Sequence, residues 1–431
     1  MLNFFNGGLH TAYFITNDIE KTIEYYRDFL GLPLYFSLKE IERDWKLYIF
    51  SVDKNFSIAF YEWKDFNPLP PKAPGAPVSG IWSFDHIMIG VEKEEDLWLI
   101  RDKYLMAGLE ITDVVDHGFV YSIYTTDPIN NISIEFGYQT YNLYNLPMFM
   151  DASPSAIADE GAFPKEKNWP ILIKNPEFEK NISPSSVSMP KEFQLDQKQL
   201  NEDFNKFAYN SYFNRVQREK LFFSFEATNH ILFYSTNNLD ETIKFYRDFL
   251  GFKLYNSFGD PYNQFKMYLF AVDESLSLSI AFFYWPTVKP IKKKNSGTPF
   301  YWWRWNSDSI SFGVSSTEKL WLLYERFLSI GMATSKITND GISNSFEVFD
   351  PNNICVKFQS FTVDFSKKPI LLDIDHLDID PFPQIRNWPT ELDVTPKGQR
   401  KVLPGAGWDL IPAEMKNAEI KVELKQEYEE E

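Results

Sequence analysis

Apolar and polar positions along the first part of the chain predict one strand, one helix and three further strands. A β-rich stretch at 8–16 comes first. From Ile19 to Leu30 the apolar residues recur every three or four positions, which is the spacing of one helix face. Asn17 or Asp18 can cap the start of this helix, and Gly31 can end it in a left-handed conformation. Three strand-like runs complete the unit, at 34–37, 46–52 and 57–63.

A second unit with the same order of elements follows a Pro-rich linker at 68–77. It begins near Ser83, and its helix is expected from Glu94 to Ala107, with Gly108 as the stop. Strands are expected near 112–115, 118–125 and 132–138. The first half of the chain is thus predicted to hold two β-α-β-β-β units, which is an α+β arrangement.

The same plan returns in the second half because the chain contains a long internal duplication. The segment from Asn17 to Tyr35 reappears, with many identical residues, from Asn237 to Tyr255. A period of this length is too long for a solenoid and indicates that one large unit was duplicated. We therefore expect four units in two tandem pairs, at 1–140 and 222–365. A connector at 141–221 is expected to wrap the first pair, and an extension with an acidic tail occupies 366–431.

Composition narrows the class of partner. The net charge of −17 disfavours nucleic acids and anionic membranes. No apolar run approaches the roughly 18 residues of a membrane span, and the N-terminus lacks the pattern of a signal peptide. The single cysteine, Cys355, excludes an intramolecular disulfide and a cysteine-rich zinc site. We expect a soluble, cytoplasmic protein whose partner is a small molecule.

Three polar residues in the first half could meet at one metal ion. His10 and His86 lie in the first strands of the first and second units, and Glu135 lies in the last strand of the second. Taken singly, a strand histidine is more often a hydrogen-bonded core or edge residue than a ligand. Together, two imidazoles and one carboxylate leave open positions on a metal, as in non-haem Fe(II) oxygenases. The metal site requires that the three side chains converge in one curved sheet.

The paired β-α-β-β-β units, the helix sequence T-I-x-Y/F-Y-R-D-F-L-G and the Asp127-Pro128 turn before Glu135 resemble the vicinal oxygen chelate superfamily. This superfamily includes glyoxalase I, extradiol dioxygenases, fosfomycin-resistance enzymes and bleomycin-binding proteins. The resemblance implies that each tandem pair forms a cup-shaped mixed sheet with outer helices around a metal. Carried over by position, the ligand sites are His10, Ala59, His86 and Glu135, which leaves three protein ligands.

The segment from Val115 to Glu135 is similar to the signature of extradiol dioxygenases. The resemblance places His117 and Tyr124 beside substrate and oxygen, as candidate catalytic residues. The alternative for His117 is an exposed turn residue. Extradiol enzymes usually have a further acid/base histidine between the two metal-binding histidines, and this chain has none between His10 and His86.

The second half has lost most of the candidate ligands. His230 corresponds to His10, but Ser309 stands at the position of His86 and Lys357 at that of Glu135. A lysine would repel a metal ion. We expect this half to be a scaffold, a lid or the surface of a homodimer, with an anion-binding cup around Lys357 as the alternative.

The resemblance to extradiol enzymes favours a mononuclear Fe(II) oxygenase or dioxygenase. His10, His86 and Glu135 would hold the metal, which would bind O₂ and a catechol or an α-hydroxy- or α-oxo-carbonyl compound. Tyr124 would hydrogen-bond the substrate and His117 would move a proton. One alternative is an isomerase, lyase or thiol transferase that uses Mn(II), Zn(II) or Ni(II). A metal-free protein that binds a small molecule is the other.

Overall fold

A computed structural model describes most of the chain. It covers residues 4–40, 45–68, 72–75, 84–140, 148–169, 183–184, 229–260, 265–286, 307–363, 369–376, 379–384, 388 and 394–405. The larger part of the predicted connector, part of the Pro-rich linker and the acidic tail from 406 onward lie outside these residues.

Within the described residues, the strands form two mixed sheets of ten strands each, which we call sheet A and sheet B. The order in sheet A is β10 (Ser183–Pro184), β16 (Thr338–Asn339), β17 (Ser343–Phe349), β18 (Cys355–Phe361), β15 (Ser307–Gly313), β1 (His10–Thr16), β4 (Phe56–Glu62), β3 (Trp45–Ser51), β2 (Leu34–Glu40) and β19 (Ile370–Leu372). The order in sheet B is β20 (Val402–Pro404), β6 (Val114–Asp116), β7 (Val120–Thr126), β8 (Ser133–Gln139), β5 (Phe84–Gly90), β11 (His230–Thr236), β14 (Leu278–Tyr284), β13 (Phe265–Ala271), β12 (Lys253–Asp260) and β9 (Met148–Met150).

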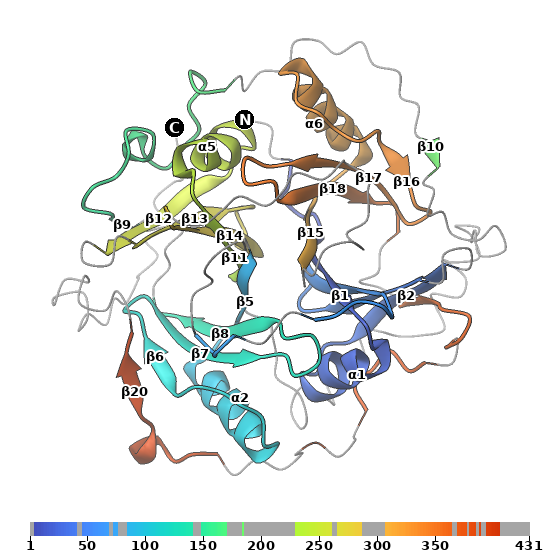
Figure 1. Ribbon diagram of the computed structural model, residues 1–431, viewed down its shortest axis with the longest axis vertical. Coiled ribbons are helices and arrows are strands. Elements are labelled where there is room, and N and C mark those ends of the chain that lie inside the picture. Colours follow the sequence, from blue (N-terminus) through green and yellow to red (C-terminus); the bar gives the residue numbers. More distant parts are fainter. Residues whose placement is uncertain are drawn as a thin grey trace, which may run out of the picture.

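The four predicted β-α-β-β-β units are confirmed, and we number them as modules one to four along the chain. The modules do not pair in the tandem order that we expected. In sheet A, β1 of module one pairs with β15 of module four, and in sheet B, β5 of module two pairs with β11 of module three, both antiparallel. Figure 1 shows β1 (blue) beside β15 (gold), and β5 beside β11. Each curled sheet therefore combines one module from each half of the chain.

The predicted helices are confirmed, but those of modules one and three contain π-helical turns. The helices of modules one and three begin as short α-helices, α1 (Ile19–Ile23) and α5 (Leu239–Ile243), which continue as π-helical turns, η1 (Glu24–Phe29) and η4 (Lys244–Phe249). Modules two and four carry α2 (Glu94–Met106) and α6 (Thr317–Ser329). The 3₁₀ turn η2 (Ala158–Glu160) lies in the connector, and the 3₁₀ turn η5 (Lys397–Gln399) lies in the C-terminal extension. None of the helices in the described part of the chain has the length and apolar character to cross a membrane.

The start and end of the first helix agree with its sequence signals. The Asp18 side chain accepts a hydrogen bond from the Lys21 backbone N–H, as an N-cap does. After η1, Gly31 has a φ of 81°, the left-handed conformation expected at a helix end.

The repeated Arg-Asp pair in these helices anchors the segments that follow modules two and four. In module one, Arg27 donates to the backbone oxygen of Asp380 at 2.6 Å, and the Asp28 carboxylate accepts from the Gln384 backbone N–H at 2.8 Å. In module three, Arg247 donates to the backbone oxygen of Ile157 at 2.8 Å. Each anchored segment crosses to the other half of the chain.

The described part of the connector therefore lies on a different module from the one that we expected. We expected the connector to wrap the first half, yet β9 pairs with β12 of module three. In the same way β19, near the C-terminus, pairs with β2 of module one. Both additions extend a sheet with a strand from the opposite half.

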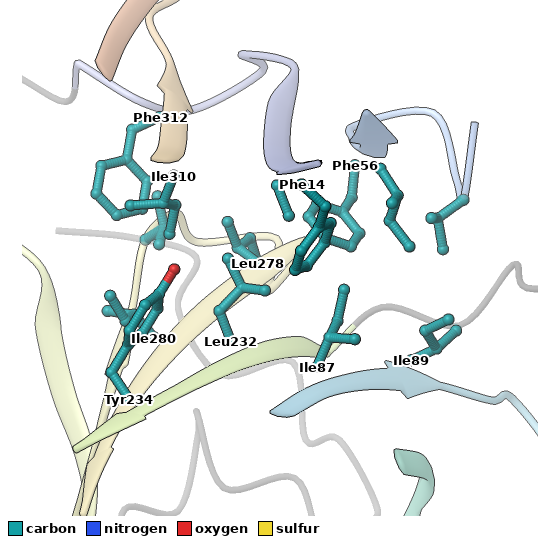
Figure 2. Close-up of a cluster of buried hydrophobic side chains, with 14 of the residues drawn as sticks. Phe14, Phe56, Ile87, Ile89, Leu232, Tyr234, Leu278, Ile280, Ile310 and Phe312 are labelled. Carbon is teal, nitrogen blue, oxygen red and sulfur yellow. The ribbon is translucent and has the colours of Figure 1, made fainter. Parts of the chain in front are cut away.

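The main core lies between the two sheets and beneath the helices. Figure 2 shows apolar side chains from the first strands of all four modules in this region, among them Phe14, Ile87, Leu232 and Ile310. On β1, Ala12 and Phe14 belong to this core, whereas Tyr13 belongs to a separate cluster on the opposite, concave face of sheet A. Alternate residues of each first strand thus face either the core or a concave face.

Two buried histidines connect the sheets through the core side. His10 on β1 lies 3.1 Å from the Asp273 carboxylate through Nε2, and its Nδ1 accepts from the Gly313 backbone N–H at 3.0 Å. His230 on β11 makes the equivalent contacts, to Asp53 at 3.2 Å and from the Gly90 backbone at 3.1 Å. Each histidine therefore joins three modules.

We predict that His10→Ala and His230→Ala each lower the free energy of unfolding by about 3 kcal/mol. Each change removes the partner of a carboxylate, which is buried in Asp273 and partly buried in Asp53. Urea unfolding followed by circular dichroism measures the effect. His376→Ala is the control, because His376 pairs with Glu20 at the surface and should change stability by less than about 0.5 kcal/mol. Equal effects of the core and surface changes would contradict the assignment.

Candidate functional site

A cavity of about 460 Å³ lies on the concave face of sheet B, and we call it the sheet-B cup. Its two walls come from different modules. The wall of module two carries the polar side chains, Asp85, His86, His117, Tyr124 and Glu135. The wall of module three is largely apolar, with Ile231, Phe233, Phe258, Met267, Leu269 and Phe283. The Pro-rich linker adds Lys72 and Gly75.

His86 is the centre of the polar wall. Its ring stacks on Phe233, with 4.1 Å between ring centroids and 17° between ring planes. Its Nδ1 lies 2.8 Å from Oδ1 of Asp85, and its Nε2 lies 2.8 Å from Oε2 of Glu135. A β-bulge makes the first contact possible, because His86 pairs with Phe233 and Phe84 with Tyr234, so that Asp85 is the extra residue of the bulge.

Opposing effects act on the ionisation of these three groups. Burial alone would lower the pKa of His86, but hydrogen bonds to Asp85 and Glu135 raise it above its ordinary value. Burial alone would raise the pKa of Glu135, but hydrogen bonds from His86 and Ser122 hold it below its usual value. Burial alone would also raise the pKa of Asp85, but its contacts with His86 and Lys72 lower it to about 2. An imidazolium between two carboxylates results.

Glu135 also receives hydroxyl donors from the neighbouring strand. Ser122 on β7 donates to Oε1 of Glu135, and Tyr124 donates to the same oxygen at 3.3 Å. Burial raises the pKa of Tyr124 well above its ordinary value, so its phenol stays protonated and can donate. His117, just after β6, lies 2.9 Å from the Tyr124 oxygen through Nε2. The structure therefore brings His117, Tyr124, Glu135 and His86 into one chain of hydrogen bonds.

His10 does not join this site, contrary to our sequence-based expectation. It lies in sheet A on the core side, and both of its ring nitrogens have partners there, Asp273 and Gly313. The cause is a shift of one residue. His86 lies eight positions before Glu94, the first residue of its helix, whereas His10 lies nine positions before Ile19. Since side chains alternate along a strand, the odd difference turns His10 to the opposite face.

Strand register identifies the true equivalents of His86 and Glu135. Met88 is the partner of Glu135 across β5 and β8, and the matching pairs in modules one, three and four are Tyr13 with Ala59, Phe233 with Ala281, and Ser311 with Lys357. His86 lies two residues before Met88. The residues at the same place in modules one, three and four are Thr11, Ile231 and Ser309.

The sheet-B cup thus has His86, Glu135, Ile231 and Ala281 at its four ligand-equivalent positions. Among the described residues, no group of three His, Cys, Asp or Glu side chains is placed to hold a metal ion. Catalytic zinc sites and Fe(II) facial triads need three protein donors, and two of these four side chains cannot donate. The residues present do not fit a catalytic metal.

Sheet A has no His, Cys, Asp or Glu side chain at the four positions equivalent to metal ligands, as the sequence predicted for module four. Its four equivalent positions carry Thr11, Ala59, Ser309 and Lys357. The Lys357 ammonium lies over the Tyr13 ring, 5.4 Å from its centroid.

The sequence did not indicate four residues of this site, Asp85, Lys72, Ser122 and Phe233. Asp85 is adjacent to His86 in the sequence, but only the bulge shows that it turns toward the imidazole. Ser122 was within reach, because it is two residues before Tyr124 and therefore shares its strand face. Phe233 comes from the other half of the chain, and no local pattern links it to His86.

Comparisons with known proteins concern the same modules. The sequence matches the family model described as Glyoxalase/Bleomycin resistance protein/Dioxygenase superfamily at residues 8–136 and 227–358. No curated protein sequence matches the chain significantly.

Among solved structures, glyoxalase I from Zea mays is similar with 12% identity, covering 82% of this chain and 92% of its own, at a TM-score of 0.47. A Bacillus subtilis protein assigned as a dioxygenase is similar with 11% identity, covering 86% and 92%, at a TM-score of 0.49. The fosfomycin resistance protein FosX from Listeria monocytogenes shares 17% identity over 31% of this chain and 94% of its own, at a TM-score of 0.24.

We predict that Gly405→Ala displaces the His117 ring. Gly405 follows β20, and a Cβ there would lie 2.6 Å from Nδ1 of His117 and 2.6 Å from Cγ1 of Val115. The backbone of Gly405 is fixed by a hydrogen bond to the Asp116 oxygen at 2.7 Å, so the histidine has to move. The measurement is the NMR shift of the His117 imidazole. Gly398→Ala is the control, because a Cβ there meets no atom within 4 Å. The same His117 shift in both variants would contradict the prediction.

Proposed function

The chain belongs to the Glyoxalase/Bleomycin resistance protein/Dioxygenase superfamily, and within it we propose that this protein binds a small, largely apolar molecule in the sheet-B cup without a metal. Members of the superfamily are generally metal-dependent enzymes that bind small-molecule substrates. The observation that carries the proposal is the donor set of the cup. His86 and Glu135 remain, while Ile231 and Ala281 stand where further ligands would be needed.

A mononuclear Fe(II) oxygenase, which the sequence favours, requires three protein donors on one ion. His86 and Glu135 supply two, and His10 is bound to Asp273 on the other face of another sheet. The same count applies to Mn(II), Zn(II) and Ni(II). We therefore do not propose a resident metal or a reaction with O₂ for this cup.

The apolar wall supplies the binding energy for such a ligand. Phe233, Phe258, Met267, Leu269 and Phe283 come from four neighbouring strands of module three. Each Å² of apolar ligand surface that leaves water contributes roughly 25 cal/mol. The volume of the cavity lies within the usual range of small-molecule sites. The polar wall then orients the ligand rather than holding it.

One observation favours acid–base catalysis as a second function. The hydrogen bonds from His117 through Tyr124 to Glu135 and His86 line the cavity. Such a chain can move a proton to or from a bound molecule, which is the chemistry of isomerases and lyases. Exchange of the acidic C–H hydrogens of tetralone in deuterium oxide, followed by NMR, tests this function. Exchange no faster than in a Tyr124→Phe variant would exclude it.

We predict that Phe283→Leu weakens the binding of naphthol about tenfold, because it removes apolar contact area from the cup. Isothermal titration measures the dissociation constant in a buffer with a chelator. Tyr61→Leu is the matched control, because Tyr61 follows Ala59 in sheet A as Phe283 follows Ala281 by two positions in sheet B. Binding that disappears with the chelator, or that Tyr61→Leu weakens equally, would contradict the proposal.

We also predict that the double variant Ile231→His with Ala281→Glu gains a metal site. The two changes place donors at the vacant ligand-equivalent positions beside His86 and Glu135. The visible absorption of added Co(II) should indicate about one tetrahedral ion per chain in the variant and none in the natural protein. Stoichiometric binding of Fe(II), Zn(II) or Co(II) by the natural protein would overturn the metal-free proposal.

A further inference from the structure

Four charged side chains alternate in sign along the polar wall of the sheet-B cup. The Lys72 ammonium lies 2.6 Å from Oδ1 of Asp85. The same Asp85 oxygen lies 2.8 Å from Nδ1 of His86, and Nε2 of His86 lies 2.8 Å from Oε2 of Glu135. We call this row the charge row. Except for histidines, Lys72, Asp85 and Glu135 are the charged residues among the described residues that line the cavity.

Geometry assigns a positive charge to His86. A neutral imidazole has one N–H and one acceptor nitrogen, but both nitrogens of His86 face carboxylate oxygens. Each nitrogen must therefore carry a hydrogen. The Tyr124 oxygen, which lies 2.9 Å from Nε2 of His117, donates to Glu135 at the end of this row. The charge row thus holds two cations and two anions.

Glu135 keeps room for one more donor. A carboxylate offers about four acceptor positions. Oε1 accepts from Ser122 and Tyr124, and Oε2 accepts from His86. One position on Oε2 is left at the cavity wall. A hydroxyl group on a ligand has the donor that this position lacks.

We infer that the ligand of the sheet-B cup is an uncharged, hydroxyl-bearing molecule with an apolar body, selected against both anions and cations by the balanced charge row. This inference rests on the proposed binding function and names its substrate class. A charged ligand would leave water for a cavity in which every fixed charge already has its partner. An uncharged hydroxyl donates to Glu135 and leaves the row intact, while the body lies against Phe233 and Phe283.

Three ligands of equal body and different charge test the inference: naphthol, naphthoate and (aminomethyl)naphthalene. Isothermal titration at neutral pH gives their dissociation constants for the full chain. We expect naphthol to bind at least about tenfold more tightly than either ion. Methoxynaphthalene, which is uncharged but has no donor, should bind more weakly than naphthol.

Two substitutions in the ion pair of Lys72 and Asp85 change the net charge of the charge row in opposite directions. Lys72→Met leaves one excess negative charge and should turn the preference toward (aminomethyl)naphthalene. Asp85→Asn leaves one excess positive charge and should turn it toward naphthoate, while His86 keeps its contact with Glu135. Lys72 lies in the linker outside both sheets, so its variant tests the inference even where Asp85→Asn does not fold.

The outcomes separate the two proposals. Equal binding of the three naphthalenes by the natural protein, or an unchanged order in Lys72→Met, overturns the inference but leaves a binding cup. Absence of binding by all four compounds overturns the proposed function and the inference with it.

Discussion

The alternation of side chains along a strand decides which histidine of this protein stabilises the fold and which one faces a ligand. His10 shares the face of Ala12 and Phe14 and lies in the core, whereas His86 shares the face of Met88 and lines the sheet-B cup. A shift of one residue relative to the following helix separates the two outcomes. In the core, His10 and His230 join modules across the two sheets through Asp273 and Asp53. These two histidines therefore connect the sheets on the face opposite the site.

The sequence predicts what depends on neighbouring residues and fails for what depends on distant ones. The stripe from Ile19 to Leu30 and the glycine after it locate a helix correctly, because both are local signals. The pairing of β1 with β15 rather than β5 could not be predicted, since all four first strands have similar apolar patterns. The position of His10 was within reach, because counting back from the helix start reveals its odd offset from His86. The stack of Phe233 on His86 depends on the pairing of modules two and three. It could not be predicted because the pairing of the modules could not be predicted.

The crossed pairing gives the duplication its functional meaning. Each cup combines a module from the first half with one from the second, so the two halves cannot be a complete site and a degenerate copy. The polar residues of the sheet-B cup come from module two, and the apolar wall comes from module three. Sheet A combines two modules without a donor at any of the equivalent positions. Among the four modules, module two alone thus has a histidine or a carboxylate at the ligand-equivalent positions, and both of these side chains line the sheet-B cup.

Within that cup, a proton on His86 does what a metal ion does in a metal-dependent cup of this fold. A carboxylate buried among phenylalanines and methionines would become neutral unless a positive charge lies beside it. In a metal site the ion supplies that charge. Here the imidazolium supplies it, and the pKa of Glu135 stays below its usual value despite burial. The imidazolium in turn pairs with a second carboxylate, Asp85, which the bulge on β5 brings to Nδ1. The ammonium of Lys72, from the linker, neutralises the charge of Asp85. With Ile231 and Ala281 at the other two ligand-equivalent positions, Glu135 thus stays charged, and side chains of the chain itself match the charges of this cup.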